Sequence, residues 1–77
     1  MRHSPATEAM LSAIKGDVRT RVDTIVDDAE GVVMELSNEA EIEAVLDGAL
    51  VAVESALTEA AEAMAREILL DYQNKLH

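Results

Sequence analysis

The stretch MELSNEAEI, residues 34–42, is where the helical pattern of this chain breaks and starts again. Asn38 is a favoured N-cap residue, and Glu41, three positions later, completes a capping box. Glu39 and Glu41 also place negative charge at the positive end of a helix dipole. The stretch therefore predicts a short turn, at about residues 37–38, between two helices.

The segment before this turn reads as one long helix. Ser4 is a favoured N-cap, and Pro5 suits the first helical position. Downstream, apolar residues recur at steps of three and four, as on one face of a helix. They are Leu11, Ile14, Val18, Val22, Ile25, Ala29, Val32 and Leu36. The pattern predicts a helix over about residues 5–36, although a break at Gly16-Asp17 would give three helices instead.

The segment after the turn has the same periodicity and predicts a second helix over about residues 39–75. Its expected contact face consists of Ile42, Leu46, Ala49, Leu50, Val53, Leu57, Ala60, Met64 and Ile68. Because a short turn joins two long helices, the helices should be antiparallel neighbours. The predicted fold class is all-α, a long antiparallel helical hairpin, in a single domain that spans residues 1–77.

Further apolar residues lie off the expected contact face of the second helix. Those toward one flank include Val51, Leu69, Tyr72 and Leu76. A single hairpin would leave them in water, and a chain of 77 residues without Cys has no disulfide to reinforce a thin core. Two hairpins packed together would bury this flank, so we expect a homodimer that forms a four-helix bundle.

The charge of the chain is strongly negative and unevenly distributed. The net charge is −10, and twelve carboxylates but no basic residue lie between Arg21 and Arg66. Phosphate backbones and anionic membranes both attract clustered Lys and Arg, so we expect neither a nucleic acid nor a membrane as partner. No apolar run approaches the ~18–20 residues that span a bilayer. The first ten residues have no hydrophobic signal core, so a cytoplasmic location is expected.

Carboxylates around the turn form the expected contact surface for a partner protein with a basic surface. They are Asp27, Asp28, Glu30, Glu35, Glu39 and Glu43. Those that approach the end of the first helix oppose its dipole, a local conflict that functional sites often contain. Alternatively, the same carboxylates only keep an Ala-rich bundle soluble, or form a salt-adapted surface.

Catalytic, cofactor and metal sites are not expected. Glu39, Glu43 and Asp47 have the i,i+4 spacing that can hold a divalent ion, but di-iron bundles need Glu-x-x-His motifs. The only histidines, His3 and His77, lie near the two ends of the chain. The scattered glycines form no phosphate-binding loop.

The predicted function is that of a small acidic, non-enzymatic interaction module. It would act as a regulator, adaptor or inhibitor by occupying a site on a partner protein. Small acidic helical proteins of phages and mobile elements often have such roles, which is an analogy of class only. The alternatives are a self-assembling structural helical bundle and, more distantly, a carboxylate metal-dependent enzyme.

Overall fold

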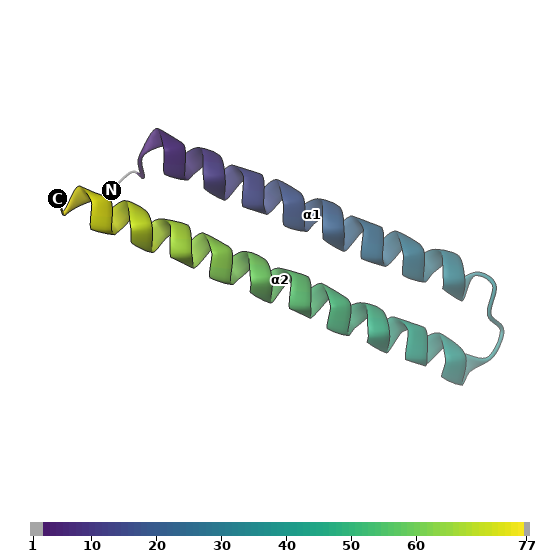
Figure 1. The fold of residues 1–77 in the computed structure, drawn as a ribbon. Coiled ribbons are helices and arrows are strands. Elements are labelled where there is room, and N and C mark those ends of the chain that lie inside the picture. Colours follow the sequence, from purple (N-terminus) through teal and green to yellow (C-terminus); the bar gives the residue numbers. More distant parts are fainter. Residues whose placement is uncertain (1–2, 77) are drawn as a thin grey trace.

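The computed structural model describes residues 3–76 and consists of two long helices, α1 (Pro5–Val33) and α2 (Glu39–Lys75). The helices run antiparallel, side by side, in a rod with extents of 60 × 15 × 14 Å (Figure 1). The first turn of α1 and the last turn of α2 lie at the same end. The predicted helical hairpin is confirmed, and α1 continues without a break through Gly16.

Both helices begin at the caps that the sequence indicates. The Ser4 hydroxyl oxygen accepts a hydrogen bond from the Thr7 amide at 3.2 Å, and Pro5 occupies the first helical position. The Asn38 side-chain oxygen accepts a hydrogen bond from the Glu41 amide at 3.1 Å. Each side chain satisfies one of the amide groups that a helix N-terminus leaves without an internal partner.

α1 ends at Val33, earlier than the sequence suggested, and the turn spans residues 34–38. The backbone tightens there: the Glu35 amide donates to the Val32 carbonyl at 3.1 Å, and the Leu36 amide donates to the Val33 carbonyl at 3.0 Å. Such i→i+3 bonds commonly close the last turn of a helix. The predicted turn at 37–38 is therefore too short by three residues at its start.

The contact face of α1 matches the predicted apolar stripe up to Ala29, and the predicted Leu36 lies in the turn beyond the helix. Val33 is half-buried in place of Val32, which is 46% exposed. The other covered positions recur at helical spacing and point toward α2. They are Leu11, Ile14, Val18, Val22, Ile25 and Ala29.

The contact face of α2 is rotated from the predicted one. Ala56 is fully covered and Ala60 is 8% exposed, so alanines occupy the centre of the contact with α1. Small side chains at such positions allow two helices to approach closely. The larger apolar residues beside them face outward, with exposures of 41–57%. We call this outward set the leucine face: Leu46, Leu50, Leu57 and Ile68. For these four residues the predicted place at the centre of the contact with α1 is wrong.

Candidate interaction surfaces

The half of the hairpin that carries the turn, residues 22–54, is exposed and acidic. It holds ten carboxylates and no Lys or Arg, and all ten side chains are exposed. No ion pair between described residues involves any of them. The rest of the chain holds six carboxylates and six Lys or Arg, so the net negative charge belongs formally to the turn half. One end of the rod therefore produces a field of a single sign.

The predicted acidic contact residues surround the turn. Asp27, Asp28 and Glu30 lie on the last turns of α1, and the set continues through the turn into the first turns of α2 with Glu35, Glu39 and Glu43. The last turn of α1 has no basic residue, so its dipole is not compensated there. The structure thus brings the six residues to one end of the rod, and their role in binding stays a prediction.

The apolar flank of α2 is exposed, as the sequence indicated. Val51, Leu69, Tyr72 and Leu76 have exposures of 54–67%. At about 100° of rotation per residue, Val51, Leu69 and Leu76 lie on the side of α2 away from α1. The leucine face lies between this flank and the contact with α1. α2 therefore carries apolar side chains on three of its sides, and α1 covers one of them.

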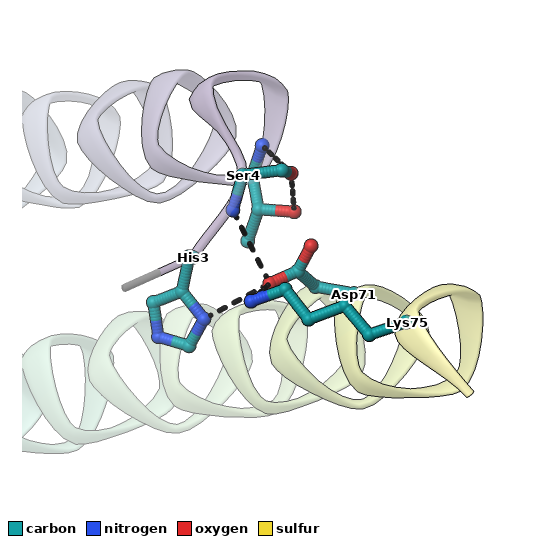
Figure 2. Close-up of polar contacts among 5 residues, drawn as sticks. His3, Ser4, Asp71 and Lys75 are labelled. Atoms are coloured by element: carbon teal, nitrogen blue, oxygen red, sulfur yellow. Dashed lines mark hydrogen bonds and ion pairs between the residues drawn. The ribbon is translucent and has the colours of Figure 1, made fainter. Parts of the chain in front are cut away.

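A polar cluster that the sequence did not indicate joins the beginning of the chain to the end of α2 (Figure 2). The Asp71 Oδ2 atom lies 3.2 Å from His3 Nδ1 and 3.2 Å from Lys75 Nζ, and it accepts a hydrogen bond from the Ser4 amide at 3.4 Å. We call His3, Ser4, Asp71 and Lys75 the terminal clamp. Together they attach the start of α1 to the last turns of α2.

The Asp71 carboxylate is almost completely covered, with 4% of the residue exposed. Burial by itself raises the pKa of this carboxyl group, but the hydrogen bonds from Ser4, Lys75 and His3 outweigh burial. Their combined effect holds the pKa of Asp71 well below its usual range. The group is therefore ionised at neutral pH, and its Oδ2 atom contacts all three donor residues.

The terminal clamp contains Ser, His and Asp but is not arranged as a catalytic triad. A nucleophilic serine needs a base at its hydroxyl group. The Ser4 hydroxyl instead donates to Thr7 Oγ1 at 3.0 Å and accepts from the Thr7 amide. The His3 ring contacts Asp71 through Nδ1. These bonds cap α1 and connect its start to the last turns of α2, which is a structural role.

Sequence reasoning missed the terminal clamp because its members are far apart in the chain. Asp71 is 68 positions from His3 and 67 from Ser4. One signal was present: Asp71 follows Ala60, Met64 and Glu67 at steps of four, three and four, so it falls on the contact face of α2. A carboxylate that is covered at such a position requires hydrogen-bond donors or a cation close by.

A second polar contact joins the helices near the middle of the rod. Arg21 Nη1 lies 2.9 Å from Glu59 Oε2, and both side chains are about half exposed or more. An exposed pair of this kind contributes at most about 1 kcal/mol. Asp17, Ile14 and Ala63 line a shallow hollow beside it, so this contact identifies one open side of the hairpin.

The carboxylates of α2 do not converge on a common point. Glu39, Glu43 and Asp47 follow one another along the helix, each about 6 Å further along the axis. Over residues 3–76, no group of three His, Asp or Glu side chains lies close enough together to hold a metal ion.

Comparisons of this chain with protein-family models, curated proteins and solved structures give no match. Within the described residues, neither helix has a long enough apolar stretch to cross a membrane.

Proposed function

We propose that this chain is a small acidic, non-enzymatic protein-interaction module. It acts as a regulator, adaptor or inhibitor by occupying a site on a partner protein with a basic surface. The observation that supports this most directly is the turn half, where ten exposed carboxylates have no Lys or Arg among them. A field of one sign attracts an oppositely charged surface and speeds the encounter of two proteins.

The shape of the molecule supports the same proposal. The six predicted acidic contact residues surround the turn, at one end of a narrow rod. The turn joins the two antiparallel helices at this end (Figure 1). Asp27 and Asp28 come from α1, whereas Glu39 and Glu43 come from α2. Because regular helices position these side chains, this end of the rod presents a defined pattern of charge to a partner.

Folding alone does not explain this distribution of charge. Lys at some of these positions would form i,i+4 pairs and would suit the C-terminal end of α1. Instead, Glu30 lies in the last turn of α1, where the helix dipole disfavours an anion. A local choice that opposes stability is typical of a surface retained for binding.

The test compares two charge reversals of equal size. In the first variant, Asp27→Lys and Asp28→Lys change the acidic end. In the control, Asp17→Lys and Glu62→Lys change exposed positions in the other half of the rod. Each protein is immobilised through its N-terminus, which precedes the end of α1 farthest from the turn. It is then exposed to lysate of the source cells at about 0.1 M salt, where the Debye length is about 10 Å.

We expect the wild type and the control to retain the same protein, identified by mass spectrometry. The acidic-end variant should retain it at least about tenfold less, the ratio that 1.4 kcal/mol of lost attraction produces. Equal losses in both variants would mean that only net charge matters, and equal retention by all three would reject the acidic end as a binding surface.

The alternative of a self-assembling structural bundle is supported by a different observation, the exposed leucine face of α2. In that case the only partner is the chain itself, and the carboxylates keep the assembly soluble. The charge reversals would then leave assembly unchanged, and the purified protein would form species larger than a dimer.

A further inference from the structure

The hairpin by itself buries little apolar surface. Among the described residues, the buried apolar side chains are Leu11, Ala56 and Ala60, and no large side chain is fully covered. The accessible surface is 5884 Å². A compact monomer of 8.3 kDa would expose about 4,600 Å². The difference exceeds the ~800 Å² that each partner buries in a standard interface.

One continuous apolar strip on α2 contains exposed large side chains that contribute to this surface. The strip contains the leucine face and the residues that lie between its members at helical spacing. In chain order it consists of Leu46, Leu50, Val53, Leu57, Ala61, Met64 and Ile68. The steps are four, three, four, four, three and four, with no polar residue among them. At 1.5 Å per residue, the strip is about 33 Å long.

The distribution of charge decides what can cover this strip. If two hairpins packed in parallel, the ten carboxylates of one turn half would lie beside the ten of the other. If they packed antiparallel, each acidic half would lie beside a half with six carboxylates and six Lys or Arg. Like charges in proximity oppose association, and opposite charges favour it.

Two of these basic residues lie on the same side of the hairpin as the leucine face. Asp17 and Arg21 line the hollow beside Glu59, on the other open side. At about 100° per residue, Lys15 and Arg19 lie on one side of the contact face of α1, and the hollow lies on the other. Lys15 and Arg19 are therefore on the same side as the leucine face. If an antiparallel pair of hairpins is centred near Leu57, Lys15 and Arg19 lie beside the turn half of the second chain.

We propose that the leucine face binds the leucine face of a second copy of this chain in antiparallel orientation. The product is a four-helix bundle whose two acidic ends point in opposite directions. This inference concerns a different face from the acidic end, so its test does not depend on the proposed function.

The orientation can be measured directly, because the chain has no Cys and a single introduced Cys defines the position of a spin label. Ser37→Cys places the label in the turn, and Thr58→Cys is the control, on an exposed position near the middle of α2. Distances between the labels of two chains are obtained by double electron–electron resonance.

In the antiparallel dimer, labels at position 37 should be separated by nearly the length of the rod, 60 Å. A parallel dimer would bring them within about 25 Å, since neighbouring helices are 8–10 Å apart. Labels at position 58 should be close in either packing and therefore show that a dimer has formed. A short distance at position 37 would overturn the proposed orientation.

The face can be tested by sedimentation equilibrium. Leu50→Glu with Leu57→Glu should raise the dimer Kd at least about 100-fold, because two leucines of each chain lose their apolar contact. The control, Leu69→Glu, changes an equally exposed leucine on the side away from α1 and should leave the Kd unchanged.

A wild type that stays monomeric at about 0.1 mM, a concentration at which even a weak Kd would show, would overturn the proposal. So would a dimer that survives the double substitution and is lost with Leu69→Glu. Circular dichroism shows whether the double variant still folds. If it does not, the label distances in the wild-type background still decide the outcome.

Discussion

The two halves of this rod have the same secondary structure and very different packing. We call residues 3–21 and 55–76 the terminal half. Among the described residues, all of the buried ones lie in this half. They are Thr7, Leu11, Ala56, Ala60 and Asp71. The turn half, residues 22–54, has none, although its helices are equally regular and its contact residues are half-buried.

The charges follow the same division. The ion pairs between described residues join His3, Lys75 and Arg21 to carboxylates of the terminal half. The turn half has ten carboxylates without such partners. Stability is therefore concentrated at one end and negative charge at the other. The comparison shows that a uniform helical hairpin can still separate the part with the buried contacts from the part that carries the net negative charge.

The largest effect should come from enlarging the tightest contact of the terminal half. Ala56 is fully covered, so Ala56→Leu forces extra carbon atoms between α1 and α2. We expect a loss of about 1–3 kcal/mol in the free energy of unfolding, measured by urea denaturation. Ala49→Leu, at a half-buried contact position of the turn half, is the control and should lose less. Equal losses at both positions would remove the distinction between the halves.

A smaller effect should follow from Asp71→Asn, which removes the charge of the terminal clamp. The folded-state pKa of Asp71 lies below its value in the unfolded chain, about 3.9. Its contribution to stability is therefore fully present above about pH 4 and is lost as the pH falls further. The difference in unfolding free energy between the wild type and the variant should shrink below that pH.

The control for this titration is Asp47→Asn, which removes one exposed carboxylate from the turn half. It should not reduce stability at neutral pH, because no ion pair of the described residues involves Asp47. If both variants lose the same stability at neutral pH, the terminal clamp contributes nothing beyond its charge.

The smallest effect should be a gain in stability at the turn half. Glu30 lies in the last turn of α1, where a cation interacts favourably with the helix dipole. Glu30→Lys should raise the free energy of unfolding by about 0.3–1 kcal/mol, again measured with urea. Glu62→Lys, in the middle of α2, should change it by less than about 0.5 kcal/mol. A loss at position 30 would mean that the charge of this end stabilises the fold.

The elements of the fold could be predicted from local signals. Ser4 with Pro5 and Asn38 with Glu41 identified the helix starts correctly, because capping depends on residues within one turn of each other. The end of α1 was less predictable. No glycine follows its last residue, and the helix closes through i→i+3 bonds, which leave no signal in the sequence.

The rotation of α2 could not be predicted by periodicity alone. Its large residues and its alanines form neighbouring stripes with the same spacing, and hydrophobicity favours the stripe of Leu46, Leu50 and Leu57. The structure packs Ala56 and Ala60 against α1 instead. Which stripe faces α1 depends on how closely the two helices approach, a property of the pair and not of either segment.

The turn and the terminal clamp also differ in how much chain must be ordered before each can form. The turn joins the two helices through residues 34–38, whereas the clamp brings together positions 68 apart. The entropy cost of closing a loop rises with its length, so contacts between α1 and α2 should form first at the turn and extend toward the termini. The turn half, whose carboxylates repel one another, is then the half that closes first. Because dissolved salt screens this repulsion, we expect it to raise the rate at which this chain folds.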